Sequence, residues 1–387
     1  MKADYYTFEI TTTQLCNLKC TYCFEDSAEG DIKVKGKKSS VTVETISKKV
    51  YELLASEEIK KHYNGHVHIV FWGGEPTLNN RMILDIIEEF GDNENISFML
   101  YSNGFIMKPY RMIQVELMNT KFKMERFHIQ ISYDGHAIHK LHRMTHGERG
   151  TENVVMKAID EIYGMGFDIS LKATMPPENF DLLNMVWDEH YELVKKYAAL
   201  PGHERATFRY CPTIDYSHGD TDNLDFDEWM RQIKMIAKKE LAFYKEHGHY
   251  LWTWFDDTEP IRCAYTSFGS TMNANGDMYK CHGEFYHNEK DVNIITTIES
   301  DNFIEEVLAT ADKMQKLNKK DYDKSTPCDT CVATHCQQCN SVKRTFSNKP
   351  TFEEQWMDFT NQPTMCKLYK MFGVVARALH SAQRRME

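Results

Sequence analysis

The chain of 387 residues is long enough for two or three packed domains. Its composition, 42% hydrophobic and 27% charged, is typical of a soluble globular protein and not of a disordered one. No apolar run approaches the roughly 18 residues needed to span a bilayer, and residues 1–13 lack the apolar core of a secretory signal. We therefore expect a cytoplasmic protein without a membrane partner. The net charge of −11 argues against nucleic acid as a partner, because phosphate binding needs a clustered basic face.

Short apolar runs alternate with amphipathic stretches from residue 5 to about 211, which predicts strands separated by helices. Strands are expected at Tyr5–Thr11, His66–Trp72, Ile96–Tyr101, Phe127–Ser132, Asp168–Thr174 and Ala206–Cys211. Helices are expected at Thr42–Ala55, Asn79–Phe90, Pro109–Met118, Glu152–Tyr163 and Phe180–Tyr197. This α/β order predicts a parallel sheet, either in a partial (β/α)6 barrel or in an open doubly wound sheet. In both folds the chemistry lies at the carboxyl ends of the strands.

The alternation stops near residue 212. Helical patterns follow over Phe226–His247, Asn302–Leu317 and Cys366–Arg385, and the stretch between Cys263 and Cys366 is otherwise loop-rich. Metal bonds are expected to hold that stretch together, as in small metal domains. We therefore predict a core domain over residues 1–215, a helical linker over 216–260, a second domain over 261–366 and a C-terminal helix over 367–387.

Eleven cysteines indicate metal sites more than disulfides, because a cytosolic compartment keeps thiols reduced. Cys16, Cys20 and Cys23 are spaced so that a short loop can bring three sulfurs toward one point. Structural zinc prefers four protein ligands, whereas three cysteines without a nearby fourth suit a [4Fe–4S] cluster with one open iron. Zinc with a distant fourth ligand is the alternative.

Two motifs in this fold pattern resemble those of the radical S-adenosylmethionine (radical SAM) superfamily. The first is C-x3-C-x2-C with an aromatic residue before the last cysteine, and the second is Gly-Gly-Glu-Pro at residues 73–76, after the next strand. The resemblance implies a partial radical SAM barrel over residues 1–215. It also implies that Cys16, Cys20 and Cys23 hold a catalytic [4Fe–4S] cluster, whose fourth iron binds the methionine moiety of S-adenosylmethionine.

The resemblance also implies a set of residues that bind S-adenosylmethionine. Backbone at Gly73 and Gly74 would face the methionyl amino group, since glycine permits close approach, and Glu75 would shape the turn. Tyr22 would lie near the adenine. The segments 101–104 and 131–135 resemble two further family motifs, which contribute Asn103 and Ser132. Arg143 is the candidate partner of the methionyl carboxylate, because a guanidinium matches carboxylate geometry; a solvated arginine on a helix face is the alternative.

The C-terminal cysteines resemble a SPASM domain, which binds two auxiliary [4Fe–4S] clusters. The family run C-x2-C-x5-C-x3-C is here C-x2-C-x4-C-x2-C. By this resemblance the first auxiliary cluster would be bound by Cys263, Cys281 and Cys339, and the second by Cys328, Cys331, Cys336 and Cys366. The first cluster would have an open iron or a ligand such as His282 or His335, and Cys211 is expected to be a buried thiol or an additional inward-facing group. Two zinc ribbons are the alternative.

The resemblance implies radical chemistry on a peptide or protein, giving oxidation or cross-linking, with a reductase such as flavodoxin or ferredoxin as electron donor. A small molecule or modified nucleoside is the alternative substrate, and a non-enzymatic zinc or iron–sulfur protein is the third hypothesis. Sulfatase maturases carry a catalytic Asp after the cysteine that ends Gly-x4-Cys, whereas here His282 follows Cys281. We therefore expect a catalytic role for His282 and a substrate other than a sulfatase. Only fifteen residues precede Cys16, too few for a fused leader-recognition domain.

Two further clusters have open interpretations. The histidines at positions 136, 139, 142 and 146 could form a second metal site, but hydrogen-bonding roles are favoured. The aromatic block Tyr250, Trp252, Trp254 and Phe255, with Asp256 and Asp257, could line a substrate channel, but core packing is favoured.

Overall fold

Six parallel strands form the centre of a curved sheet. The computed structural model describes residues 4–23, 38–121, 124–200, 209–210, 224–255, 269–283, 294–321 and 363–385. In it the strands pair in the order β1-β3-β4-β5-β7-β8, each parallel to the next. Their bounds are β1 (Tyr6–Thr13), β3 (Val67–Gly73), β4 (Ile96–Ser102), β5 (Phe127–Ser132), β7 (Asp168–Ala173) and β8 (Arg209–Tyr210). The predicted parallel sheet is confirmed; residues 206–208 and 211 of the last predicted strand lie outside the described ranges.

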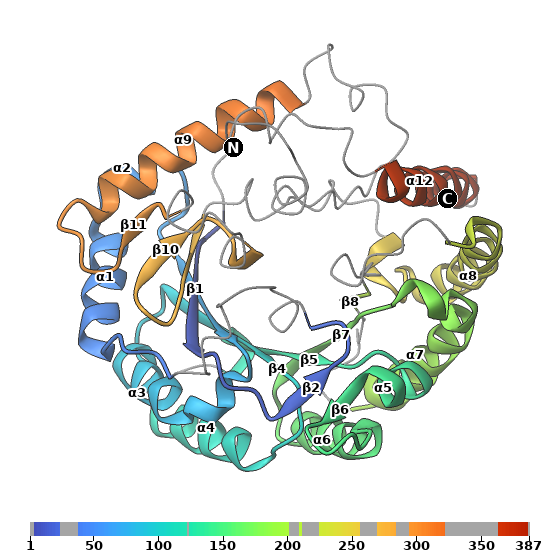
Figure 1. The fold of residues 1–387 in the computed structure, drawn as a ribbon, viewed down its shortest axis with the longest axis horizontal. Coiled ribbons are helices and arrows are strands. Elements are labelled where there is room, and N and C mark those ends of the chain that lie inside the picture. The colour runs from blue at the N-terminus through green and yellow to red at the C-terminus, as the bar shows by residue number, and fades with distance from the viewer. Residues whose placement is uncertain are drawn as a thin grey trace.

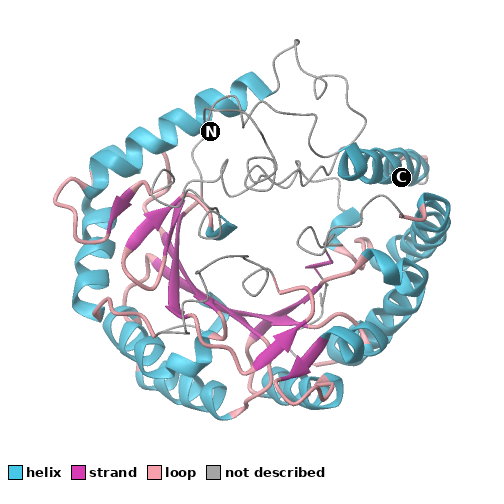
Figure 2. Ribbon diagram, in the orientation of Figure 1, coloured by secondary structure: helices cyan, strands magenta, loops and turns pink. Residues whose placement is uncertain are grey.

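The connecting helices lie along the outer face of this curved sheet (Figure 1). Figure 2 shows the same arrangement by element type, with strands inside and helices outside. The fold is therefore a partial barrel and not a doubly wound sheet, in which helices cover both faces. The helices are α1 (Val43–Ala55), α2 (Glu57–Lys60), α3 (Asn80–Phe90), α4 (Lys108–Asn119), α5 (His136–His142), α6 (Glu152–Gly164) and α7 (Leu183–Ala198), with 3₁₀ turns at Pro76–Asn79, Met124–Arg126 and Pro177–Leu182.

Alternation along the strands gives the sheet an apolar outer face and a more polar inner face. In β5 the outward residues Phe127, Ile129 and Ile131 are fully buried in the core, whereas the residues between them are half-buried. Helices such as α3 contribute apolar residues to the same core, among them Ile83 and Ile86. The inner face of the barrel is thus lined in part by polar groups.

Three short strands extend the sheet beyond β1, in a stretch that was expected to be loop-rich. They are β9 (Gly269–Met272), β10 (Asp277–Tyr279) and β11 (Thr296–Thr297), and β9 runs parallel to β1. A side chain at Gly269 would meet the Thr7 carbonyl oxygen at 2.4 Å, so glycine permits this pairing. The expectation of a loop-rich stretch is wrong here, because residues 269–272 belong to the same sheet as the barrel.

Three long helices complete the described part of the chain: α8 (Phe226–His247), α9 (Phe303–Asp321) and α12 (Pro363–Gln383). α8 packs against α7 and α12. The aromatic block that follows α8, which includes the 3₁₀ turn Thr253–Phe255, is buried, and the Trp254 ring stacks on Phe372 with centroids 3.7 Å apart. Core packing is therefore confirmed for its four aromatic residues, while Asp256 and Asp257 lie outside the described ranges. None of the helices in the described ranges has the length and hydrophobicity that a membrane span requires.

Candidate functional site

Cys20 lies on a small two-stranded ribbon, with Cys16 before it and Cys23 after it along the chain. Strand β2 (Leu18–Cys20) pairs antiparallel with β6 (Arg143–Thr145), so that Cys20 lies opposite Arg143. The chain then turns at once, because the Cys23 N–H donates to the Cys20 carbonyl over 3.1 Å. Sequence patterns did not indicate this ribbon, since each strand has only three residues. It brings the loop after β1 next to the segment after β5.

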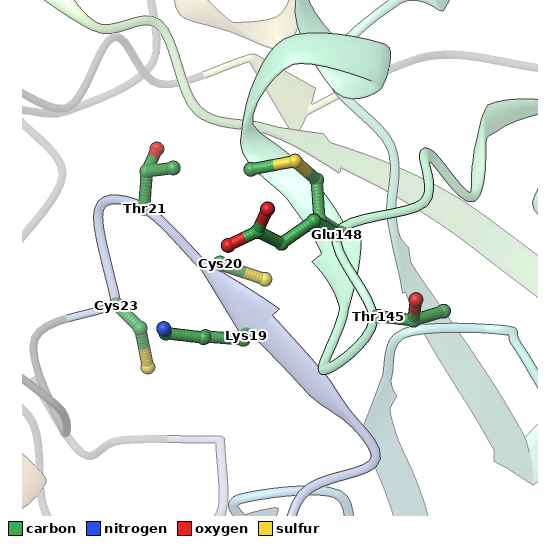
Figure 3. Close-up of a pocket in the computed structure, with 7 residues that line it drawn as sticks. Lys19, Cys20, Thr21, Cys23, Thr145 and Glu148 are labelled. Carbon is green, nitrogen blue, oxygen red and sulfur yellow. The ribbon is translucent and has the colours of Figure 1, made fainter.

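A cavity of about 300 Å³ opens beside the ribbon. It is lined from the cysteine loop by Lys19, Cys20, Thr21 and Cys23, and from the facing hairpin by Met144, Thr145 and Glu148. Figure 3 shows Cys20 and Cys23 on one side of this space, with Thr145 and Glu148 on the other. Two of the three predicted cluster ligands therefore border a cavity.

The two glycines after β3 lie against the backbone that leads into the cysteine loop. Gly73 has a φ of 134°, and a side chain there would meet the Thr13 carbonyl oxygen at 2.1 Å. A side chain at Gly74 would meet the Leu15 carbonyl oxygen at 2.5 Å. The Gly74 N–H donates to Thr13 and the Glu75 N–H donates to Leu15. Glycine is thus required here by the protein's own backbone, and the predicted contact with a methionyl amino group stays a prediction.

Glu75 is buried and organises the loops after β3 and β4. Its Oε1 accepts hydrogen bonds from the Thr77 N–H and hydroxyl and from the Ser102 hydroxyl, and its Oε2 accepts the Asn103 N–H over 2.8 Å. Burial nevertheless raises the pKa of Glu75 above its usual value. The predicted role of Glu75 in shaping the turn agrees with these contacts.

Asn103 links the loop after β4 to Cys16. Its Nδ2 lies 2.8 Å from Oδ1 of Asn17 and 3.9 Å from the Cys16 sulfur, and its Oδ1 accepts the Phe105 N–H. Burial raises the pKa of the Cys16 thiol to about 12, and the nearby negative charge of Glu75 contributes to the same shift. Since the thiolate is the form that binds metal, a positively charged iron site beside Cys16 would supply the charge that favours it.

Tyr22 and Arg143 meet at a buried carboxylate. Asp134 accepts the Tyr22 hydroxyl and, in a two-pronged ion pair, Arg143 Nε over 2.7 Å and Nη2 over 3.1 Å. The Arg143 guanidinium also lies 5.3 Å from the Tyr22 ring centre. Burial opposes ionisation, but Arg143 lowers the pKa of Asp134 below its usual value. Arg143 is therefore buried and paired within the chain, contrary to a solvated arginine; its role toward a methionyl carboxylate stays a prediction.

The histidines near the ribbon hold the local backbone together. His142 bonds through Nδ1 to the Thr21 hydroxyl over 2.6 Å and through Nε2 to Asn179 over 2.7 Å. His146 reaches the Cys16 carbonyl and His139 reaches Thr151. Hydrogen-bonding roles are thus confirmed for these three. In the described part of the chain, no three His, Cys, Asp or Glu side chains converge closely enough to surround a single metal ion. The case for a cluster at the triplet therefore rests on its donors and their surroundings.

His282 contacts one residue of β1 and one of β3. Its ring stacks on Trp72 with centroids 4.8 Å apart, and its Nδ1 lies 3.2 Å from Oε2 of Glu9. Burial opposes ionisation, but the bond to His282 lowers the pKa of Glu9 below its usual value. The neighbouring Cys281 is buried.

The other predicted residues are less completely defined. Ser132 ends β5, half-buried and paired in register with Lys172. The predicted auxiliary ligand Cys366 lies on α12. Outside the described ranges lie Cys211, Cys263, Cys328, Cys331, His335, Cys336 and Cys339. Sequence reasoning gave no role to Asp134 or Glu9; Asp134 stood within the 131–135 motif, and only the structure reveals its partners.

Comparisons with known proteins agree with this fold. Residues 10–186, from β1 to α7, match the family model described as Radical SAM superfamily. The chain is 32% identical over 137 residues to a cysteine-type anaerobic sulfatase-maturating enzyme of Clostridium perfringens, covering 33% of this chain and 32% of the relative. It is 20% identical over 183 residues to the radical SAM cyclopropyl synthase TigE of Paramaledivibacter caminithermalis, covering 46% of this chain and 36% of that protein. The chain thus spans about a third of the length of these curated relatives.

Solved structures extend the similarity to the whole fold. The structure of native anSMEcpe with bound AdoMet and Cp18Cys peptide superposes with a TM-score of 0.71 at 17% identity, over 99% of both chains. Streptococcus suis SuiB bound to S-adenosylmethionine gives a TM-score of 0.55 at 13% identity, over 91% of this chain and 76% of SuiB. At these identities the similarity establishes a shared fold. The family match thus shows a radical SAM domain over residues 10–186, and the solved structures show that the fold is shared.

Proposed function

We propose that this chain is a radical SAM enzyme that acts on a peptide or protein and oxidises or cross-links it. The observation that carries the proposal is the triplet Cys16, Cys20 and Cys23, which follows β1 at the carboxyl edge of the barrel and lies within the family match. When bound, a [4Fe–4S] cluster and S-adenosylmethionine supply the 5′-deoxyadenosyl radical that removes hydrogen from the substrate. An external reductase such as flavodoxin or ferredoxin supplies the electron.

The residues around the triplet support this proposal because their donors suit the two groups. The three cysteines would hold the cluster, with Cys16 held in place by Asn103. Tyr22, Ser132 and Arg143 would contact S-adenosylmethionine together with the loop formed by Gly73, Gly74 and Glu75. These residues bind and orient; the reactive chemistry belongs to the cofactor.

A peptide substrate is favoured by what relatives bind. One anSMEcpe structure holds AdoMet and a Cp18Cys peptide, and one SuiB structure holds the precursor peptide SuiA. We carry the class of substrate, a peptide, to this chain and not the particular reaction, since His282 stands where sulfatase maturases are expected to carry a catalytic Asp. A small molecule or modified nucleoside is the second candidate substrate.

A C-terminal SPASM domain with two auxiliary [4Fe–4S] clusters is part of the proposal. Cys263, Cys281 and Cys339 would hold the first, and Cys328, Cys331, Cys336 and Cys366 the second. Their proposed task is to accept an electron from the substrate radical or to bind substrate. The burial of Cys281 beside the sheet supports a ligand role, because the shell around a metal site controls the access of solvent.

His282 is proposed as a catalytic residue that faces the substrate, held by Glu9 and Trp72. Replacing it with glutamine should leave iron content unchanged and reduce peptide product about 100-fold. If His282 is instead a ligand of the first auxiliary cluster, the same variant should lose iron and change its electron paramagnetic resonance spectrum. Glu9→Gln provides the companion variant, since it loosens His282 without altering any predicted ligand.

The proposal is tested by anoxic reconstitution followed by iron, sulfide and zinc analysis. The expected result is iron and sulfide in excess of one cluster per chain, and cleavage of S-adenosylmethionine to 5′-deoxyadenosine after reduction. Cys20→Ala should abolish that cleavage. Transfer of deuterium from a labelled peptide into 5′-deoxyadenosine would identify the substrate class. Zinc without iron would instead establish the non-enzymatic hypothesis, and retained cleavage by Cys20→Ala would refute the triplet's role.

A further inference from the structure

Asp134 carries a fully buried carboxylate whose hydrogen-bonding capacity is filled. Oδ2 accepts the Tyr22 hydroxyl and Arg143 Nε, while Oδ1 accepts Arg143 Nη2 and the Thr174 N–H over 2.7 Å. An ionised carboxylate offers about four lone-pair sites, and four donors occupy them here. The donors come from three separate segments: the cysteine loop, β6 and the residue that follows β7.

The position of Asp134 is itself fixed. It follows β5 directly, and the Tyr133 N–H continues the pairing with β7 by donating to the Lys172 carbonyl. The next residue, Gly135, has a φ of 86°, and a side chain there would meet Val186 at 2.9 Å. The carboxylate is thus attached to the rigid sheet on one side and to a closely packed helix on the other.

Tyr22 is held on several sides by groups near Asp134. Its ring lies 5.3 Å from the Arg143 guanidinium and 5.4 Å from the His142 ring, and the adjacent Thr21 N–H donates to the His142 carbonyl. Cys20 and Cys23 flank this unit along the chain. Arg143 pairs with Asp134 through Nε and Nη2, and its Nη1 takes no part in this ion pair.

We propose that Asp134 is a positioning residue that ties the cysteine loop to Arg143 and to the sheet, so that Tyr22 and Arg143 keep a fixed orientation beside Cys20 and Cys23. The part of the inference that concerns S-adenosylmethionine rests on the proposed function, in which Tyr22 and Arg143 face that molecule. The restraint of the cysteine loop depends only on contacts within the chain. Buried partners of this kind typically change affinity about 10- to 100-fold when removed.

The decisive variant is Asp134→Asn, which removes the charge and half of the acceptors at nearly constant volume. The matched control is Asp160→Asn, because the exposed Asp160 also accepts a tyrosine hydroxyl, that of Tyr197 over 2.7 Å, and pairs with a cation, Lys196, but lies on α6. The two readouts are hydrogen exchange of residues 16–23 without S-adenosylmethionine, and the Kd for S-adenosylmethionine by equilibrium dialysis of the anoxically reconstituted protein.

We expect Asp134→Asn to speed exchange of residues 16–23 about tenfold or more and to raise the Kd about 10- to 100-fold at unchanged iron content. Asp160→Asn should match the wild type in both. If Asp134→Asn does not fold, Tyr22→Phe decides, since it removes a single hydroxyl and should shift both readouts in the same direction. The inference is overturned if Asp134→Asn shows the exchange rate and the Kd of the wild type. Where Asp134→Asn does not fold, the same result in Tyr22→Phe overturns it. A wild type that binds neither iron nor S-adenosylmethionine would defeat the proposed function, while the exchange comparison would still test the restraint.

Discussion

Asn103 donates a 2.8 Å hydrogen bond from Nδ2 to Oδ1 of Asn17, the residue that follows the first cysteine of the triplet. The same nitrogen lies 3.9 Å from the Cys16 sulfur. The loop after β4 therefore supports the cysteine loop directly. The sequence suggested Asn103 as a residue that binds S-adenosylmethionine, and in the structure it contacts a predicted cluster ligand.

Asn103→Asp should weaken iron retention at the triplet. The substitution keeps the Oδ1 acceptor for the Phe105 N–H, but replaces the donor toward Asn17 and Cys16 with a negative charge. We expect iron to pass to a chelator about 10- to 100-fold faster than from the wild type. Asn153→Asp, at an exposed position on α6, is the control and should behave like the wild type. Equal rates for the two variants would contradict this role of Asn103.

Gly74→Ala should destabilise the fold through the cysteine loop. The added carbon would lie 2.5 Å from the Leu15 carbonyl oxygen and 2.7 Å from that of Gln14, both backbone atoms that cannot rotate away. We expect a loss of about 1–3 kcal/mol in the free energy of unfolding, measured by urea denaturation. The control is Gly164→Ala at the end of α6, where nothing lies within 4 Å. That change should be neutral or stabilise by up to about 1 kcal/mol.

Several helices and strands were predictable because their signals are local. α8 begins and ends where its periodicity indicates, with Asp225 capping its first turn and Gly248 following its last residue. β5 has its predicted bounds because polar and apolar residues alternate along it without interruption. The position of Glu75 in the turn after β3 also followed from the sequence.

The remaining features depend on partners that lie far away along the chain. β2 and β6 are each three residues long and form only because they pair with each other. β9 joins the sheet through pairing with β1, which no pattern in residues 269–272 indicates. Asp134 stood in a recognised motif, but its role depends on Tyr22, Arg143 and Thr174, which only the fold brings together.

Glu75→Gln should reduce stability although it preserves the size of the side chain. Three donors converge on Oε1, and the Asn103 N–H points at Oε2, so an amide nitrogen at either position would face a donor. We expect a loss of about 1–3 kcal/mol in the free energy of unfolding. Glu89→Gln, which alters an exposed carboxylate that accepts the Tyr51 hydroxyl, should change it by about 0.5 kcal/mol or less. A loss no larger than that of the control would show that the loop adjusts to the amide.

His139 should make the protein sensitive to mild acid. Thr151 donates its hydroxyl to the Arg143 carbonyl, so His139 donates its Nε2 proton to Thr151. Within the described residues, the buried Nδ1 of His139 has no hydrogen-bond partner that would stabilise a second proton. Burial lowers the pKa of His139 to about 3, from 6.5 for an ordinary histidine. Below an ordinary histidine's pKa the unfolded chain therefore binds a proton that the folded chain does not, and stability falls with decreasing pH.

His139→Gln should remove this part of the pH dependence. Between the two pKa values, each pH unit of acidification lowers the wild type's free energy of unfolding by about 1.4 kcal/mol through this residue. The plot of unfolding free energy against pH should therefore have a slope smaller by that amount in the variant. Urea denaturation at several pH values above and below that of an ordinary histidine measures it. Thr151→Val is the control, because it removes the hydrogen bond but keeps the histidine, so it should lower stability while the slope persists. An unchanged slope in His139→Gln would mean that His139 is protonated in the folded protein, with its proton held at Nδ1.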